Sequence, residues 1–270
     1  MPSARIGVFD SGLGGLTVVR ELLHQAPGAD ILYVADQAHV PYGPRPLEHI
    51  RAFAEAISRY LQTQGCATVV MACNISSATA LETVRCALPD IQCHGVIDPA
   101  VRSARQGPPG PVGVLATAGT IASRAYSRAL GRTMPAVPVT EVACPDFVPI
   151  VEGGRTGTAE ALDACSRYLA PLRGRAAQVI LGCKHYPLLL PDLHAAASAM
   201  GWMMRVVDPA AEAAREAILC AGVNGTTGGR LVLQTTGDGA HFSAQAQAVL
   251  GYAVAPAVME LHWHEDGCLA

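Results

Sequence analysis

Residues 69–74, VVMACN, and residues 179–184, VILGCK, carry the pattern that decides the fold of this chain. Each is an apolar run ending in a cysteine, and the two cysteines, Cys73 and Cys183, lie 110 residues apart. Two further segment pairs recur at nearly the same offset: VIDPA at 96–100 with VVDPA at 206–210, and IGVFDS at 6–11 with VGVLAT at 112–117. Three matched pairs in the same order predict a duplicated α/β unit.

Short β-branched runs alternate with helical patterns along the chain, which is typical of mostly parallel sheets covered on both faces. Strands are expected at 6–9, 31–34, 68–72, 94–97, 112–115, 139–143, 178–181, 205–207 and 231–235, and helices at 16–25, 47–64, 77–87 and 210–221. The predicted fold is α/β, with two pseudo-symmetric domains. Residues 1–97 with 210–270 form the first domain, residues 98–209 form the second, and a Gly/Pro-rich run at 106–111 is the candidate linker.

Reactive or polar side chains follow several of the predicted strands, namely Asp10, Cys73, Thr117 and Cys183. Because ligands bind at the carboxyl ends of parallel strands, we expect these side chains to share one cleft between the domains. Two thiols on opposite sides of a cleft suit the removal of a proton from one face of a carbon and its return to the other. The alternative for any cysteine is a small buried hydrophobe, the default interpretation of Cys66, Cys86, Cys93, Cys165 and Cys220.

The composition narrows the class of protein. Half the residues are hydrophobic and 15% are charged, which is typical of a globular protein. The net charge of −3 gives no excess of positive charge for binding nucleic acid. The charge-free stretch 60–81 contains Gln62, Gln64 and Asn74, which argues against a membrane span. Nine cysteines without CxxC spacing or an N-terminal signal segment favour a reducing compartment over a zinc or disulfide framework.

Three smaller features leave alternatives open. The run GLGGLT at 12–17 lacks the third glycine of a dinucleotide loop, so it either holds a carboxylate through backbone N–H groups or is a tight strand-to-helix turn. Lys184, the only lysine, lacks the phosphate loop that a pyridoxal phosphate Schiff base would need. Its ammonium either acts as a cation beside Cys183, receives a substrate carboxylate, or reaches solvent. His262, His264 and Cys268 could bind a metal, but a loose terminal segment is expected there.

Together these motifs resemble the glutamate racemase family, cofactor-independent enzymes of the aspartate/glutamate racemase superfamily. The resemblance covers nearly the whole chain and is carried by GVFDSGLGGLT at 7–17, VPYG at 40–43, ACN at 72–74 with SA at 77–78, ATAGT at 116–120, and LGC at 181–183 with HYP at 185–187. It implies two α/β domains with the active site between them, often in a homodimer, and neither a cofactor nor a metal.

The resemblance also implies roles for individual residues. Cys73 and Cys183 would be the acid/base pair, assisted by Asp10, Glu152 and His185. The substrate site would be lined by Asp10, Ser11, Pro41, Tyr42, Gly43, Asn74, Ile75, Thr117, Thr120, Lys184 and His185. The implied reaction converts L-glutamate to D-glutamate for peptidoglycan synthesis, and hence cell wall biogenesis and cell shape, in a bacterial cytoplasm.

Two residues depart from the family pattern, because Ile75 and Lys184 stand where the family usually has threonine. Those threonines would bind the polar ends of the amino acid, partly through backbone N–H groups. Ile75 keeps a backbone donor but lacks the hydroxyl, a loss of about 0.5–1.5 kcal/mol. The departures leave open a proton-transfer enzyme with another substrate, such as another racemase or a decarboxylase, or a catalytically silent binding or regulatory protein.

Overall fold

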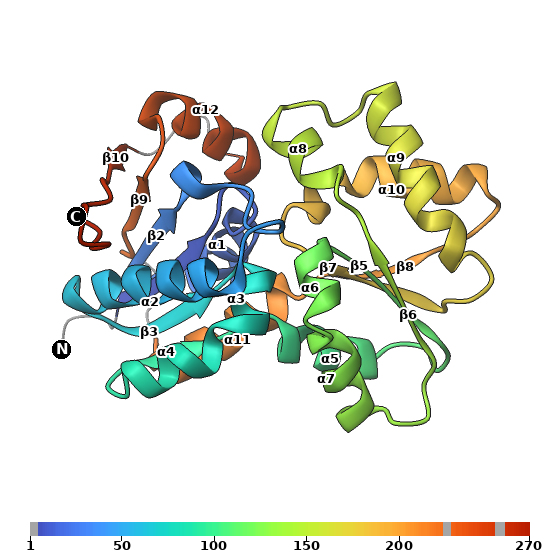
Figure 1. Ribbon diagram of the computed structural model, residues 1–270, viewed down its shortest axis with the longest axis horizontal. Coiled ribbons are helices and arrows are strands. Elements are labelled where there is room, and N and C mark those ends of the chain that lie inside the picture. The colour runs from blue at the N-terminus through green and yellow to red at the C-terminus, as the bar shows by residue number, and fades with distance from the viewer. Residues whose placement is uncertain (1–4, 224–227, 252–256) are drawn as a thin grey trace. The chain divides into compact units, whose positions relative to one another are not determined.

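The chain forms two compact α/β units, each built on its own parallel sheet (Figure 1). The computed structural model describes residues 5–223, 228–251 and 257–270. Unit 1 comprises the chain up to Val96 and from Ala210 onward, and unit 2 comprises Ile97–Pro209.

Over the described residues, the sheet of unit 1 has six strands in the order β10-β9-β2-β1-β3-β4. Every pair in it is parallel, and β1 at its centre is buried on both faces, which explains its continuous apolar run. The strands are β1 (Arg5–Asp10), β2 (Ile31–Ala35), β3 (Cys66–Met71), β4 (Gln92–His94), β9 (Leu231–Thr235) and β10 (Val258–Glu260).

Helices cover both faces of this sheet. On one face α1, α11 and α12 pack together, and on the other α2 lies against β3 beside α3 and α4 (Figure 1). Asp238 begins α12 by accepting a hydrogen bond from the His241 N–H, and Gly251 ends it in the left-handed conformation. The helices are α1 (Leu16–Gln25), η1 (Gln37–His39), α2 (Leu47–Thr63), α3 (Asn74–Thr79), α4 (Leu81–Ala87), α11 (Ala210–Ala221) and α12 (Gly239–Leu250).

The sheet of unit 2 has four parallel strands in the order β6-β5-β7-β8. Its main core lies between this sheet and helices α8, α9 and α10. The strands are β5 (Val112–Ala116), β6 (Val139–Ala143), β7 (Gln178–Gly182) and β8 (Arg205–Val207). The helices are α5 (Ile97–Arg105), α6 (Ala118–Ala122), α7 (Ala125–Thr133), α8 (Phe147–Glu152), α9 (Ala159–Leu169), η2 (Ala170–Leu172), η3 (Tyr186–Leu189) and α10 (Leu190–Ala199).

The two sheets repeat one topology. The order β2-β1-β3-β4 in unit 1 matches β6-β5-β7-β8 in unit 2, and β9 and β10 extend only the first sheet. Cys73 follows β3 and Cys183 follows β7, so the two thiols occupy equivalent places in the repeat. The predicted fold class, two pseudo-symmetric α/β domains with mostly parallel sheets, is confirmed.

Two predicted elements were wrong around Ser77. The expected strand 94–97 stops at His94, because the chain bends at Val96 and Ile97 already begins α5. The expected helix 77–87 is instead two helices, α3 and α4, and α3 starts directly after Cys73. The Ser77 hydroxyl links the two regions, since it donates to the Met71 carbonyl and accepts from the Val96 N–H.

The C-terminal residues form an ordered hairpin, not the loose segment expected. His262 and Ala270 exchange two backbone hydrogen bonds, and Trp263 pairs with Leu269 in an antiparallel bridge. Within the described residues, no group of three or more His, Cys, Asp or Glu side chains is placed to hold a metal ion. Over the same residues, no helix combines the length and apolar character needed to cross a membrane.

Candidate active site

Cys73 stands at the junction between β3 and α3. Its backbone is extended at the N-terminal cap of α3, and its carbonyl accepts the Ser77 N–H at 2.9 Å. The side chain is 5% exposed and packs in a small apolar cluster with Tyr42, Ile50 and Ile75. The thiol is therefore held by its surroundings at the end of a central strand, as the sequence predicted.

Asp10 is the last residue of β1, which pairs with β3, and Asp36 follows β2, which pairs with the other side of β1. The Asp36 N–H donates to the Asp10 carbonyl at 2.9 Å, and the Ala72 N–H donates to the Phe9 carbonyl at 2.9 Å, so the three strand ends are aligned. Asp10 is buried, and its Oδ2 accepts the Gly12 N–H at 3.1 Å. Within unit 1, Asp10 and Cys73 thus lie at the same edge of the sheet.

The glycine-rich run after Asp10 is a tight turn packed on that aspartate. A Cβ at Gly15 would lie 2.7 Å from the Asp10 Cβ and 2.8 Å from the Tyr33 ring, so no side chain fits there. The Tyr33 hydroxyl closes the turn by donating to the Gly12 carbonyl at 2.6 Å. Ser11, in the same turn, is buried. These contacts support the interpretation of the run at 12–17 as a tight strand-to-helix turn.

The VPYG segment is anchored through Tyr42. Its hydroxyl donates to Asp36 Oδ2 at 2.5 Å, and the Val40–Pro41 peptide bond is cis. Burial, followed by the negative charge of Asp36, raises the pKa of Tyr42 well above its usual value, so Tyr42 remains a neutral donor. Tyr42 is buried, whereas Pro41 is exposed and Gly43 is half-buried.

Cys183 belongs to a chain of polar contacts in unit 2. Its Sγ lies 3.7 Å from His185 Nδ1, and His185 Nε2 lies 2.5 Å from Glu152 Oε1. Burial alone would lower the pKa of His185. Hydrogen bonds to Cys183 and Glu152 outweigh it and hold that pKa well above its usual value. The geometry fits an imidazolium, which donates from both ring nitrogens.

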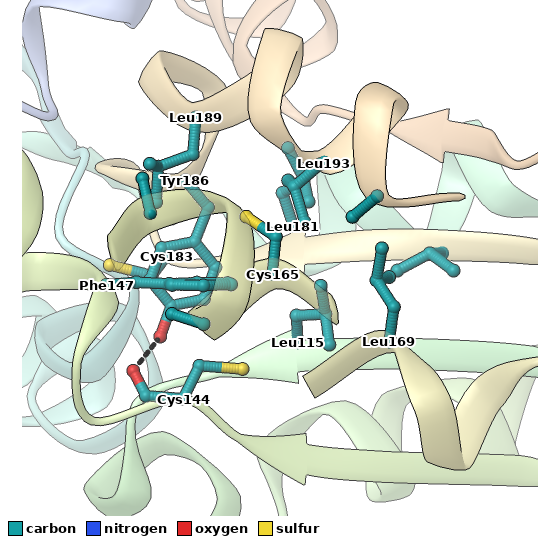
Figure 2. Close-up of a cluster of buried hydrophobic side chains, with 14 of the residues drawn as sticks. Leu115, Cys144, Phe147, Cys165, Leu169, Leu181, Cys183, Tyr186, Leu189 and Leu193 are labelled. Carbon is teal, nitrogen blue, oxygen red and sulfur yellow. Dashed lines mark hydrogen bonds between the residues drawn. The ribbon is translucent and has the colours of Figure 1, made fainter. Parts of the chain in front are cut away.

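The thiol of Cys183 sits at the edge of the main core of unit 2 (Figure 2). The rings of Phe147 and Tyr186 meet edge to face at 4.8 Å, and the Tyr186 hydroxyl donates to the Cys144 carbonyl at 3.0 Å. Directly before the thiol, Gly182 allows close packing, since a Cβ there would lie 2.9 Å from the Leu115 carbonyl oxygen. The core therefore fixes the backbone that carries Cys183.

Thr117 and Thr120 lie at the neighbouring strand end. Ala116 pairs with Gly182 across β5 and β7, which brings the next residues, Thr117 and Cys183, to the same edge of the sheet. The hydroxyls of Thr117 and Thr120 are 3.0 Å apart and hydrogen-bonded. Both threonines thus contribute polar atoms at the strand ends of unit 2.

Lys184 does not reach solvent. Its side chain is fully buried, and its Nζ lies 2.5 Å from Oδ1 of Asp208, whose side chain is 24% exposed. Asp208 directly follows β8, in the VVDPA segment of the repeat. Of the alternatives left open, a lysine whose head reaches solvent is therefore wrong, because an acidic partner compensates the buried ammonium.

The predicted residues form one group in each unit. In unit 1 the edge of the sheet gathers Asp10, Ser11, Tyr42, Cys73, Asn74 and Ile75, and in unit 2 it gathers Thr117, Thr120, Glu152, Cys183, Lys184 and His185. The two copies differ at the second position after the cysteine, which is the apolar Ile75 in unit 1 and the titratable His185 in unit 2. Sequence reasoning missed the contacts of Asp36 and Asp208, although each directly follows a strand.

The fold and this site define a class of protein: a duplicated parallel α/β unit with a buried thiol after the third strand of each copy. Residues 6–217 match the family model described as Asp/Glu/Hydantoin racemase. The chain belongs to this family, and within it to the glutamate racemases.

Relatives at good coverage support this assignment. The glutamate racemase of Gloeobacter violaceus is 44% identical over 213 residues, 78% of each chain. Among solved structures, glutamate racemase isoform RacE1 from Bacillus anthracis has a TM-score of 0.87 and 32% identity, covering 96% of this chain and 97% of that one. Glutamate racemase from Francisella tularensis in complex with D-glutamate also has a TM-score of 0.87, at 27% identity, covering 96% of this chain and 98% of that one. The resemblance seen in the sequence motifs is confirmed.

Proposed function

We propose that this protein interconverts L- and D-glutamate without a cofactor, using Cys73 and Cys183 as the acid/base pair. The observation that carries the proposal is the equivalence of the two cysteines. Each is a buried thiol that closely follows the third strand of its unit. The activity of the relatives and the structure of one of them with D-glutamate support glutamate as substrate.

The proposed reaction balances with one proton removed and one supplied. One cysteine, as thiolate, takes the Cα proton and becomes a thiol, which leaves the carbon with the electron pair. The other cysteine, as thiol, gives its proton to the opposite face of that carbon and becomes a thiolate. The reverse reaction uses the same pair with the roles exchanged, so two equivalent units suit it.

The two thiols have different support. An imidazolium at His185, held by Glu152, lies 3.7 Å from the Cys183 sulfur and stabilises negative charge there. The residue at the matching place beside Cys73 is Ile75, which carries no charge. We propose that Asp10 assists Cys73 instead, since both lie at the same edge of the sheet.

We further propose that the remaining predicted residues bind the polar ends of glutamate. Hydroxyls, the Asn74 amide and backbone N–H groups are suited to its carboxylates and ammonium group. Lys184 would take part through its main-chain N–H, because its ammonium already pairs with Asp208. The full proposed set is Asp10, Ser11, Pro41, Tyr42, Gly43, Asn74, Ile75, Thr117, Thr120, Lys184 and His185.

The biological setting is part of the proposal. D-Glutamate would serve peptidoglycan synthesis in a bacterial cytoplasm, and the enzyme would act as a homodimer. All nine cysteines are thiols, which suits a reducing compartment. Sedimentation of the purified protein would test the dimer, and a monomer at assay concentration would contradict it.

Solvent isotope exchange tests the reaction directly. In D₂O, L-glutamate and D-glutamate are incubated separately with the enzyme, and Cα deuterium is followed by NMR while enantiomer content is followed by circular dichroism. Each product enantiomer should carry deuterium, because the donating thiol exchanges with solvent. If a folded protein neither exchanges the Cα hydrogen of glutamate nor inverts its configuration, the proposal is wrong.

Cysteine variants test the assignment of the pair. Cys73→Ser and Cys183→Ser should each lower kcat by about 100- to 10,000-fold, the usual range for losing a proton-transfer group. The exposed Cys86 and Cys220 provide matched controls, and their serine variants should keep wild-type kcat. Full activity in either Cys73→Ser or Cys183→Ser would remove that residue from the mechanism.

A second candidate is racemisation of, or proton transfer on, another amino acid. It is favoured by Ile75, an apolar side chain that packs directly beside Cys73 where the family resemblance implies a threonine. A panel of L- and D-amino acids under the same isotope assay separates the two candidates. If another substrate is preferred, Ile75→Thr combined with Lys184→Thr should raise kcat/KM for glutamate. Glutamate binding without any exchange would instead indicate a silent binding protein.

A further inference from the structure

Asp36 gathers side-chain donors from two distant parts of unit 1. It is fully buried, and its Oδ2 accepts the Tyr42 hydroxyl at 2.5 Å, with His39 Nδ1 at 2.9 Å. Its Oδ1 accepts the Thr236 hydroxyl at 2.8 Å and the Trp263 Nε1–H at 2.7 Å. The carboxylate thus joins the VPYG segment to the C-terminal part of the chain.

Aromatic packing joins the same two segments. The ring of Phe53, on α2, lies 5.5 Å from Trp263, 5.6 Å from Tyr42 and 4.0 Å from His39, measured between centroids. The Trp263 and His39 rings also meet edge to face at 5.2 Å. Trp263 therefore contacts the surroundings of Tyr42 by both a hydrogen bond and a ring cluster.

The C-terminal hairpin fixes Trp263 in this place. The residues on both sides of it are hydrogen-bonded, His262 to Ala270 and His264 to Cys268. The ring packs against the core of unit 1, which includes Leu261 and Leu269. A side chain held in this way can act as a fixed point for the more exposed VPYG segment.

We propose that Trp263 is a positioning residue for Tyr42, acting through Asp36 and Phe53 on a residue of the glutamate site. The inference deepens the proposed function and rests on it, because that function places Tyr42 against the substrate. Tyr42 packs in one cluster with Cys73 and Ile75, so a displaced Tyr42 ring would alter the surroundings of the first thiol.

The physical argument concerns the two oxygens of Asp36. Hydrogen bonds from His39, Tyr42 and Trp263 outweigh burial and lower the pKa of Asp36, so the carboxylate stays charged and needs its donors. Without the Trp263 N–H, Oδ1 loses one of its charge-assisted bonds. The carboxylate then turns toward its remaining donors, and the Tyr42 hydroxyl must follow Oδ2.

The experiment compares steady-state kinetics of Trp263→Phe, which keeps a ring but removes the N–H donor, with two other variants. Trp202→Phe replaces the only other tryptophan, in unit 2, and is the matched control. Trp263→His restores a ring N–H. Trp263→Phe should raise KM for glutamate about 5- to 20-fold with kcat within about 2-fold, the scale of a partly lost bond to a charged group. Trp202→Phe should change neither KM nor kcat. Trp263→His should have a KM between that of Trp263→Phe and that of wild type.

A double-mutant cycle with Tyr42→Phe separates positioning from a general loss of stability. If Trp263 acts through Tyr42, then Trp263→Phe should change KM less than about 2-fold once the Tyr42 hydroxyl is gone. An equal rise of KM in both backgrounds, or no rise in either, would overturn the inference.

The cycle also distinguishes failure of the inference from failure of the proposed function. A wild-type enzyme that neither binds nor turns over glutamate refutes the proposed function. The coupling of Trp263→Phe with Tyr42→Phe can then be measured in denaturant unfolding, where positive coupling supports the path through Asp36 and independent effects overturn it.

Discussion

The Lys184–Asp208 pair offers the sharpest test of how this chain departs from its family. Lys184→Met keeps the length of the side chain and removes its charge, and Asp208→Asn keeps the shape of the partner. The pair and their combination form a double-mutant cycle. The question is whether the ammonium is held by Asp208 or is available to a substrate carboxylate.

The structure sets the expected magnitudes. Asp208→Asn leaves a fully buried ammonium without its counter-charge, and breaking a buried pair in this way costs about 3–5 kcal/mol of unfolding free energy. Lys184→Met leaves a carboxylate that is 24% exposed, so its partial hydration reduces the cost to about 1–3 kcal/mol. The double variant has no unpaired charge and should unfold within about 1 kcal/mol of wild type, which gives a coupling of about 3 kcal/mol or more.

Tryptophan fluorescence during urea unfolding can follow unit 2 alone. In a Trp263→Phe background Trp202 is the only tryptophan, and it packs on the core of unit 2. The exposed ion pair of Arg155 and Glu160, with its atoms 2.9 Å apart, is the control within the same unit. Its cycle, made with Arg155→Met and Glu160→Gln, should give a coupling of about 0.5 kcal/mol or less.

Two results would refute this reasoning. One is a coupling for Lys184 and Asp208 no larger than that of the control pair, because the ammonium would then not depend on its partner. The other is a large rise in KM for glutamate in the double variant, because the lysine charge would then serve the substrate. The expected outcome is a glutamate KM within about 3-fold of wild type, since losing a direct charged contact costs about 10-fold or more.

Three further outcomes are expected. Glu152→Gln should lower unfolding stability at pH 7 by about 1.5–3 kcal/mol, measured by urea titration, since it removes a hydrogen bond to a charged group. The pKa of His185 in the folded protein is raised above its usual value of 6.5. Its contribution to the free energy of unfolding is therefore complete below pH 6.5 and is lost as the pH rises through the folded-state pKa. Unfolding titrations across this range should therefore slope downward in wild type and be flatter in Glu152→Gln; equal slopes would contradict the assignment. Gly182→Ala should cost about 1–3 kcal/mol and lower kcat, since its Cβ meets backbone 2.9 Å away, whereas Gly131→Ala in open space on α7 should gain up to about 1 kcal/mol. If Gly182→Ala changed neither the unfolding free energy nor kcat, the backbone before Cys183 would be able to shift and make room for the Cβ.

Much of the fold followed from local pattern. The helices 16–25 and 210–221 and the strands 139–143, 205–207 and 231–235 have the predicted bounds. In the two helices the buried residues recur at helical spacing, so local sequence and tertiary context favour the same structure. The failures lie around Ser77, whose hydroxyl is bonded to the backbone at both Met71 and Val96, and in the C-terminal hairpin. No local pattern carries such a contact.

In the candidate site, too, the features written in consecutive residues were predicted, whereas those that depend on distant contacts were not. The repeat and the motifs singled out Cys73 and Cys183, because each ends an apolar strand and precedes polar residues, a feature written in consecutive positions. Their roles as acid and base remain a prediction from resemblance. The state of Lys184 could not be predicted, since its partner is 24 residues away and only the pairing of β7 with β8 makes them neighbours.

The sequence by itself determined a duplicated parallel α/β fold with a thiol after the third strand of each copy, because strand order and apolar period repeat along the chain. Only the tertiary structure decided which partner each buried charge meets: Lys184 with Asp208, His185 with Glu152, and the Asp36 carboxylate with the neutral Trp263 N–H. Burial makes an unpaired charge costly, so each buried charge must find a partner. Chain topology, not proximity in sequence, determines which partner is within reach.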